Sequence, residues 1–264
     1  MTVSYQQTAI VTGAAQGVGL EAAKLLAERN YHVIVSDINA EAGEQAVAEI
    51  NANFGRNAAT FVACDVSSTY DLDKLFSFTI EKFSGFSVLV NNAGYLRAPF
   101  LVVSGKTVSD MIAINLTAAL YASHQAIQYW GDHPDMRGTV VNIGSSSCVK
   151  GYASIAAYSA AKAGIAQFTF NCQTLGPRIR VNSVAPTAIA TALGYSMLVP
   201  TPAGKSGPGW EIEQEMVAEY QHLLQPAQVA IAALECIDDE TRFGKVVYID
   251  AKHGQKTWSG YCME

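Results

Sequence analysis

TAIVTGAAQGVG, the stretch from Thr8 to Gly19, decides the fold of this 264-residue chain. Its first five residues form a short apolar run typical of a buried strand, and apolar residues at helical spacing follow the glycines. Glycines at such a junction let the chain turn tightly and let backbone N–H groups approach a pyrophosphate, which the helix dipole also attracts. The spacing alone is equally typical of an ordinary glycine-rich turn, but its place between strand and helix favours a phosphate site.

The same alternation of strand and helix continues to the end of the chain. Seven short apolar runs predict strands, and a predicted helix follows each of the first six. The strands are 8–12, 32–36, 60–64, 87–91, 139–143, 179–183 and 245–249; the helices begin near Val18 and Leu72 or span 40–51, 108–129, 157–174 and 227–235. This pattern predicts one α/β domain over 1–264, a doubly wound Rossmann fold with a seven-stranded parallel sheet and helices on both faces.

An irregular segment separates the sixth predicted strand from the last helix. It contains the Pro/Gly-dense stretch 199–209, and we expect an insertion at about 191–225 to cover a ligand site at the carboxyl ends of the strands. Its apolar and aromatic residues either pack under a loop or form a lid over an apolar substrate, and both interpretations stay open. These residues are Tyr195, Met197, Leu198, Trp210, Met216 and Tyr220.

Asp37 ends the second predicted strand and indicates which cofactor the glycine turn binds. A carboxylate at this position accepts both ribose hydroxyls of NAD and repels a 2′-phosphate. Neither Gln16 nor Ile38, beside that position, is a basic residue that would favour NADP. An acid at a strand end is often only a turn residue, yet together with the glycines Asp37 predicts NAD.

A second group of polar residues surrounds the fifth predicted strand. Tyr158 and Lys162 lie four residues apart, on one face of the predicted helix, so an ammonium can stand beside a phenol and favour the phenolate. Such pairs also arise by chance on half-exposed helices. Ser145, at the carboxyl end of the preceding strand, favours the functional interpretation because strand ends meet at the cofactor crevice.

Composition excludes several other classes of protein. The chain is 50% hydrophobic and 15% charged with a net charge of −6, which excludes intrinsic disorder and disfavours a nucleic-acid binder. The five scattered cysteines and dispersed histidines predict reduced thiols and no metal site. With no signal-peptide pattern and no apolar run long enough for a bilayer, we expect a cytoplasmic enzyme without a membrane or nucleic-acid partner.

These motifs, in this order, resemble the short-chain dehydrogenase/reductase family over essentially the whole chain. The matching elements are Thr12–Gly19, Asp65-Val66, Asn91-Asn-Ala-Gly94, Asn115, Ser145, Tyr158-x-x-x-Lys162 and Arg180-Val-Asn-Ser-Val-Ala-Pro186. Within the family, Ala14-Ala-Gln, Glu41-Ala-Gly and Lys252-x-Gly254 resemble the 15-hydroxyprostaglandin dehydrogenase-like branch. The resemblance implies an NAD(H)-dependent oxidoreductase that interconverts a secondary alcohol and a ketone on a small to medium apolar substrate.

The resemblance also assigns roles to individual residues. Tyr158 becomes the general acid/base, Ser145 a hydrogen-bond partner of the substrate oxygen, and Lys162 the cation that lowers the pKa of the tyrosine and holds the nicotinamide ribose, while Asn115 relays protons. Cofactor contacts fall on Gly13, Gln16, Gly17, Val18, Gly19, Asp37, Ile38, Asp65, Val66, Asn92, Ala93, Gly94, Tyr158, Lys162, Pro186, Ile189 and Thr191, and the substrate pocket on Ser147, Tyr152, Ile155 and Tyr195. A homodimer or homotetramer through the helices at 108–129 and 157–174 is expected.

Two positions depart from the family pattern. Thr187 follows Pro186 where the family usually has glycine, which puts the shape of the nicotinamide loop in question. Ile155 stands where the prostaglandin branch has a substrate-binding glutamine, so a prostaglandin-like substrate is unsupported.

The sequence disfavours some alternative functions and leaves others open. A hydrolase nucleophile in Ser145-Ser-Ser-Cys148 is disfavoured because Cys148 replaces the second glycine of the G-x-S-x-G motif. The chain could also be a non-catalytic NAD sensor or a non-redox enzyme on the same fold, although the complete set of Asn115, Ser145, Tyr158 and Lys162 argues against this. A carbonyl reductase that runs mainly in the reductive direction also remains open.

Overall fold

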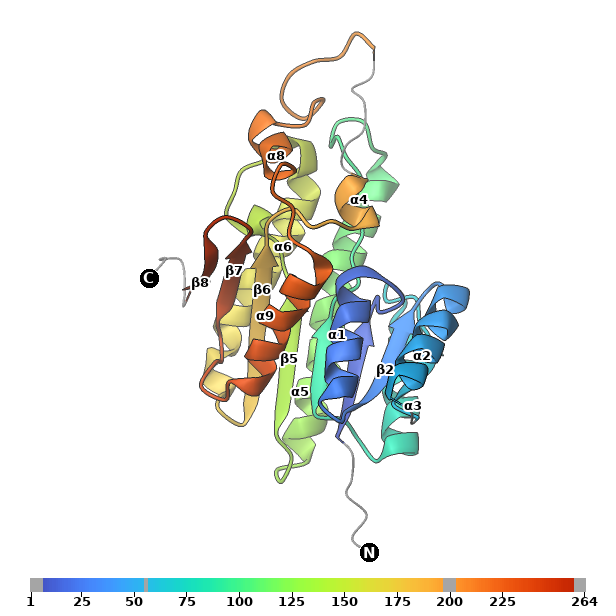
Figure 1. The fold of residues 1–264 in the computed structure, drawn as a ribbon. Coiled ribbons are helices and arrows are strands. Elements are labelled where there is room, and N and C mark those ends of the chain that lie inside the picture. The colour runs from blue at the N-terminus through green and yellow to red at the C-terminus, as the bar shows by residue number, and fades with distance from the viewer. Residues whose placement is uncertain (1–6, 55–56, 197–202, 259–264) are drawn as a thin grey trace, which may run out of the picture.

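A single twisted sheet forms the centre of the protein (Figure 1). The computed structural model describes residues 7–54, 57–196 and 203–258. Within them the strands run in the order β3-β2-β1-β4-β5-β6-β7-β8. Their bounds are β1 Thr8–Thr12, β2 His32–Asp37, β3 Ala59–Ala63, β4 Val88–Asn91, β5 Gly138–Ile143, β6 Ile179–Pro186, β7 Val246–Asp250 and β8 Gly254–Trp258. The first seven pair in parallel, as expected, and the order reverses between β1 and β4.

The predicted strand count of seven is wrong, because β8 adds an eighth strand antiparallel to β7. Gly254 makes the reversal possible with a φ of 73°, and the register places Val247 opposite Thr257. Four of the five residues of β8 lack a buried side chain, and only Trp258 packs into the interior. An edge strand of this composition carries no apolar run, so the sequence pattern gave no signal for it.

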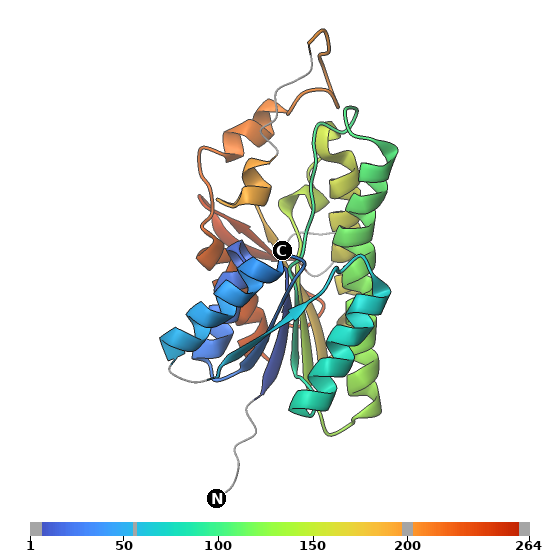
Figure 2. The same cartoon turned by 90° about the vertical axis from the view of Figure 1, so that its right-hand side faces the viewer.

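Helices cover both faces of the sheet, as Figure 2 shows. On one face lie α1 Gly17–Glu28, α2 Ala40–Phe54 and α9 Pro226–Asp238, and on the other α3 Thr69–Phe83, α5 Ala118–Asp132 and α6 Ala156–Asn171. Side chains of each strand alternate between the two layers: Val11 packs into the core beneath α1 and α9, whereas Ile10 packs into the core beneath α3 and α5. The predicted burial of both sheet faces is therefore confirmed.

The long helix expected at 108–129 is interrupted. It consists of α4 Gly105–Ile112, a π-helical turn at Ala113–Thr117, and α5. Asn115 lies at the centre of that turn and is almost completely buried. Because π turns widen the helix and redirect side chains, they occur frequently at functional sites.

The segment between β6 and α9 lies above the carboxyl ends of the strands, where the insertion was expected (Figure 1). It contains two short helices, α7 Ala192–Tyr195 and α8 Gln214–Glu219, and an isolated bridge between Ile189 and Leu224. Met197 and Leu198, two of the residues assigned to a possible lid, lie outside the described residues. Among the described helices, none combines the length and apolar character needed to cross a bilayer.

Candidate active site

One long cleft of about 950 Å³ runs along the carboxyl ends of the central strands. Its walls come from the loops after β1 to β6, and α8 contributes to one end. A cleft at this place is expected because the chain reverses its direction of winding between β1 and β4, which leaves a crevice between the diverging loops.

The glycine turn closes one wall of the cleft. Gly13 and Gly17 have φ angles of 62° and 59°, which favour glycine. A Cβ on Gly13 would lie 2.8 Å from the Cα of Ala93, and one on Gly17 would meet the side chain of Thr191 at 3.4 Å. Gly13 thus permits tight packing of the turn against the loop after β4, and Gly17 keeps the cleft side of the turn free of a side chain, as close approach to a pyrophosphate requires.

Asn92 fixes the glycine turn to the loop after β4. Its Nδ2 donates to the carbonyl oxygens of Thr12 and Gly13 at 3.0 and 2.8 Å, and the hydroxyl of Thr12 accepts from the backbone N–H of Asn92 at 3.1 Å. Two loops that lie far apart in the sequence are therefore held as one rigid wall. A Cβ on Gly19 would collide with the same amide of Asn92, so this glycine serves close packing rather than lining the cleft.

Asp37 marks the end of the cleft beside β2. Its Oδ2 accepts from the backbone N–H of Ala15 at 3.0 Å and its Oδ1 from that of Asn39 at 3.0 Å. Ile38, 70% exposed, and Asp65 line the same end. Among the described residues that line the cleft, the single basic side chain is Lys162, which stands away from this end.

Ser145, Tyr158 and Lys162 come together where β5 leads towards α6. The Lys162 Nζ donates to the carbonyl oxygen of Ile143 at 2.8 Å and lies 5.5 Å from the centre of the Tyr158 ring. The Ser145 Oγ accepts from the hydroxyl of Ser147 at 3.0 Å and from its backbone N–H at 3.2 Å. The structure thus brings the predicted phenol, ammonium and serine to one point of the cleft.

Burial controls the protonation of Tyr158 and Lys162. It raises the pKa of Tyr158 to about 12, against the lowering effect of a hydrogen bond from Ser145, and it lowers the pKa of Lys162 to about 8. The same cause raises the pKa of the Cys148 thiol to about 11, which disfavours a thiolate nucleophile beside the site. Desolvation, rather than the charge of Lys162, therefore dominates the pKa of Tyr158 here.

Asn115 stands behind the cleft. Its Nδ2 donates to the carbonyl oxygens of Tyr95 and Met111 at 2.5 and 2.9 Å, and its Oδ1 accepts from the backbone N–H of Tyr95 at 3.2 Å. The π turn places this amide so that it fixes the backbone of Tyr95, a residue of the cleft wall. The proton relay assigned to Asn115 by resemblance stays a prediction.

The opposite end of the cleft is largely apolar. Leu96, Ile155 and Met216 form a small buried cluster, against which Tyr152, Tyr158, Leu193 and Tyr220 pack. Of the residues expected in the substrate pocket, Ser147, Tyr152 and Ile155 line this end, whereas Tyr195 is 52% exposed on α7 and does not belong to the lining. Glu219, which sequence reasoning missed, also lines it, and a single acid on a short helix carries no pattern that could have singled it out.

The remaining predicted cofactor residues meet along the cleft. With the exception of Gly19 they all line it: Gly13, Gln16, Gly17, Val18, Asp37, Ile38, Asp65, Val66, Asn92, Ala93, Gly94, Tyr158, Lys162, Pro186, Ile189 and Thr191. Thr187, the departure from the family pattern, is buried and donates its backbone N–H to Ile249 at 3.0 Å, so it extends the pairing of the strand ends. The described residues contain no group of three or more His, Cys, Asp or Glu placed to hold a metal ion.

A Rossmann sheet with this cleft defines a class of dinucleotide-binding α/β proteins. Comparison with known families makes the assignment narrower, because the family model for short chain dehydrogenases matches residues 7–198. The protein "Short chain dehydrogenase helC" of Aspergillus fumigatus is 52% identical over 96% of this chain and 99% of its own length. Momilactone A synthase of Oryza sativa subsp. japonica is 31% identical over 90% of this chain and 85% of its own.

Solved structures agree with this assignment. A variant of actinorhodin polyketide ketoreductase, determined with NADPH, superposes with a TM-score of 0.80 at 25% identity, covering 95% of this chain and 98% of that one. The 3-ketoacyl-(acyl-carrier-protein) reductase of Brucella melitensis, complexed with NADH, has the same fold, with a TM-score of 0.79 at 22% identity over 93% and 97% of the two chains. The chain belongs to the short-chain dehydrogenase family and is an oxidoreductase of that family.

Proposed function

We propose that the protein is an NAD(H)-dependent oxidoreductase that interconverts a secondary alcohol and a ketone on a small to medium, rather apolar substrate. The observation that carries the proposal is the meeting of Ser145, Tyr158 and Lys162 in a cleft whose far end holds Asp37. The glycine turn lines the cleft between them, so a dinucleotide bound along the cleft would have a ribose-binding acid at one end and a proton-transfer group at the other.

The residues present fit a dinucleotide cofactor. Gly13 and Gly17 line the cleft without side chains, so a pyrophosphate would approach the backbone of this turn closely, and the N-terminus of α1 would supply a favourable dipole for it. Asp37 would accept from ribose hydroxyls, and its negative charge, with no arginine or lysine lining that end among the described residues, disfavours the 2′-phosphate of NADP. Because the two structural relatives were determined with NADPH and NADH, the choice of NAD rests on Asp37.

A bound nicotinamide supplies the hydride chemistry, and the side chains of this chain handle the proton. In the oxidising direction the Tyr158 phenolate takes the hydroxyl proton of the substrate, while the Ser145 hydroxyl donates a hydrogen bond to the substrate oxygen. In the reducing direction the phenol returns the proton to the carbonyl oxygen. The apolar wall of Leu96, Ile155 and Met216 holds the substrate and excludes water from the reacting carbon.

Lys162 supports this proton transfer by its position. Anchored on the Ile143 carbonyl, its ammonium stands over the Tyr158 ring and favours the phenolate over the neutral phenol. Because its own pKa is lowered to about 8, the charge of Lys162 is itself sensitive to the surroundings near neutral pH. A bound dinucleotide, which carries negative phosphates, would raise the charged fraction of Lys162 and thereby promote the phenolate.

The experiment that tests the proposal is to incubate the purified protein with NAD or NADP and a panel of secondary alcohols and ketones while following the absorbance of the reduced cofactor. We expect turnover with NAD and little with NADP. Binding of NAD without any redox change across a broad panel would instead support the sensor function. The ratio of oxidation to reduction rates distinguishes a dehydrogenase from a carbonyl reductase.

Assembly and location are further expectations, which rest on the family resemblance and on the sequence. We expect a homodimer or homotetramer that uses the outer faces of α5 and α6, and a cytoplasmic location. Light scattering of the purified protein measures the first, and a monomeric mass would contradict it.

A further inference from the structure

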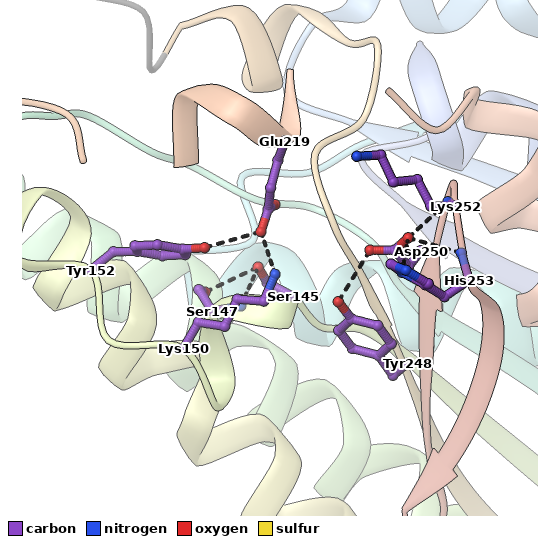
Figure 3. Close-up of polar contacts among 9 residues, drawn as sticks. All are labelled: Ser145, Ser147, Lys150, Tyr152, Glu219, Tyr248, Asp250, Lys252 and His253. Carbon is purple, nitrogen blue, oxygen red and sulfur yellow. Dashed lines mark hydrogen bonds and ion pairs between the residues drawn. The ribbon is translucent and has the colours of Figure 1, made fainter. Parts of the chain in front are cut away.

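Glu219 stands at the substrate end of the cleft, on the last turn of α8. Its carboxylate Oε1 accepts a hydrogen bond from the Tyr152 hydroxyl at 3.0 Å and forms an ion pair with the Lys150 ammonium. Both partners belong to the loop between β5 and α6, residues 144–155, which also carries Ser145 and Ser147 (Figure 3). We call this set of interactions the α8–loop contact.

The α8–loop contact is not an ordinary surface ion pair. The Glu219 side chain is 16% exposed and that of Lys150 34%, whereas the i, i+4 pair of Lys106 and Asp110 is far more open to solvent. Burial lowers the pKa of Lys150, but the hydrogen bond and charge of Glu219 outweigh it and raise that pKa above its ordinary value. Exposed pairs contribute little because water screens them, so the half-buried position gives this contact more weight.

Lys150 is also anchored from its other side. Its ammonium lies 5.9 Å from the centre of the Tyr248 ring on β7, and Tyr248 in turn donates to Asp250 at 3.4 Å (Figure 3). Glu219 therefore binds a lysine that also contacts the sheet. The carboxylate joins the insertion to the loop after β5, and Lys150 extends this contact to β7.

A second acid, at the start of α8, also binds the loop between β5 and α6. Glu213, which precedes α8, accepts from the backbone N–H of Ser154 at 3.0 Å and also from its hydroxyl. Met216, between the two acids, is buried against Ile155 in the apolar wall. One face of α8 thus lies on the loop that carries the substrate-binding residues.

We propose that Glu219 is a positioning residue, which through Lys150 and Tyr152 holds α8 against the loop between β5 and α6 and so completes the wall of the substrate pocket. The inference rests on the function proposed above for that pocket. Without the contact, α8 separates from the loop for part of the time, and only the closed fraction binds substrate. The apparent affinity falls by that fraction, whereas bound substrate selects the closed form and is converted at the usual rate.

The test compares Glu219→Gln with Glu215→Gln, a matched loss of charge on the exposed side of the same helix. We expect Glu219→Gln to raise KM for the alcohol about tenfold, as the loss of a hydrogen bond to a charged group would, with kcat within about threefold of the native value. The Kd for NAD should not change, and Glu215→Gln should match the native enzyme. A KM within about twofold of native, or an equal loss of NAD affinity, would overturn the proposal.

The partner residue and an activity-independent measurement complete the test. Lys150→Met should raise KM by a similar factor, and the double variant should be no worse than either single one, because both remove the same interaction. Hydrogen exchange of the cofactor-free proteins should be faster at 214–219 and 146–155 in Glu219→Gln, with β5 unchanged. This readout needs no turnover, so unchanged exchange refutes the contact, whereas faster exchange in a redox-silent protein refutes only the proposed function.

Discussion

The two ends of the cleft are built in different ways. At the end of the cleft beside Asp37, where we propose that the cofactor binds (the cofactor end), the wall is built around backbone: a glycine turn and a strand-end loop locked together by Asn92 and Thr12. At the opposite end, where we propose that the substrate binds (the substrate end), the wall consists of side chains carried by an insertion, joined by polar contacts from Glu213 and Glu219 and by the apolar cluster around Met216. A backbone-built site tolerates few changes and suits an invariant ligand, whereas a side-chain-built wall can vary with the substrate.

Tyr158 lies where the two ends of the cleft meet. Removing its hydroxyl should therefore have the largest effect on turnover and little effect on NAD binding. Tyr158→Phe keeps the ring and its packing but removes the group that holds the proton. We expect turnover to fall by about 10³-fold or more, within the range of general acid/base catalysis, while NAD affinity stays nearly native. Steady-state kinetics and fluorescence titration with NAD measure the two effects. Retained turnover would remove Tyr158 as the acid/base.

Asp37 tests the cofactor end alone. Asp37→Ala should weaken NAD binding about tenfold to a hundredfold, the usual weight of hydrogen bonds to a charged group, and should bring NADP closer to NAD. Its hydrogen bonds to Ala15 and Asn39 are lost as well, so a thermal melt is needed to show that the fold persists. An unchanged ratio of NADP to NAD affinity would contradict the ribose assignment.

The pH dependence of kcat/KM tests the protonation of Tyr158. Burial raises the pKa of Tyr158 to about 12, so the phenolate is scarce near neutrality and its fraction grows with pH. The kcat/KM for alcohol oxidation should therefore climb by up to about tenfold per pH unit through the neutral range, and that for ketone reduction should not. A profile of both directions against pH measures this. Oxidation that slows steadily from neutral to alkaline pH would argue against a phenolate base.

A substitution at Gly13 should have a smaller effect than the changes above, and it tests the backbone of the glycine turn. A methyl group there meets Ala93, and the φ of 62° is strained for any other residue, so Gly13→Ala should cost about 1–3 kcal/mol of stability and weaken NAD. Gly105→Ala is the control, since a Cβ at that position in α4 has no neighbour within 4 Å. Thermal or urea unfolding measures both. Equal stability of the two variants would mean that the turn can relax.

The same contrast explains which parts of the fold and the cleft could be predicted from the sequence. The strands, the helix layers and the glycine and acidic residues that line the Asp37 end of the cleft follow from local signals: apolar runs, glycines and an acid at a strand end. The substrate end does not, because Glu219 meets Lys150 and Tyr152 across a large separation in sequence, and no periodicity encodes such a contact. The sequence did not predict β8 for a related reason. This polar edge strand buries only one residue, Trp258, so it carries no apolar run.

The pKa values of Tyr158 and Lys162 also could not be predicted from the sequence. The spacing of Tyr158 and Lys162 predicts a nearby cation, but the balance between that cation and desolvation depends on how deeply the cleft buries both groups. For Tyr158, desolvation has the larger effect. Likewise, the position of Asn115 in a helix was expected, whereas the π turn that directs its amide to the backbone of Tyr95 was not.

Isotope transfer tests the proposed chemistry most directly. An alcohol that the enzyme oxidises is prepared with deuterium on its carbinol carbon, incubated with NAD and the full-length protein, and the reduced cofactor is analysed by mass spectrometry. If the cleft performs hydride transfer as proposed, the deuterium appears in the reduced cofactor with the native protein and is absent with Tyr158→Phe, which still binds NAD. Ketone formation without deuterium in the cofactor, or labelled cofactor formed equally well by Tyr158→Phe, would contradict the proposed mechanism.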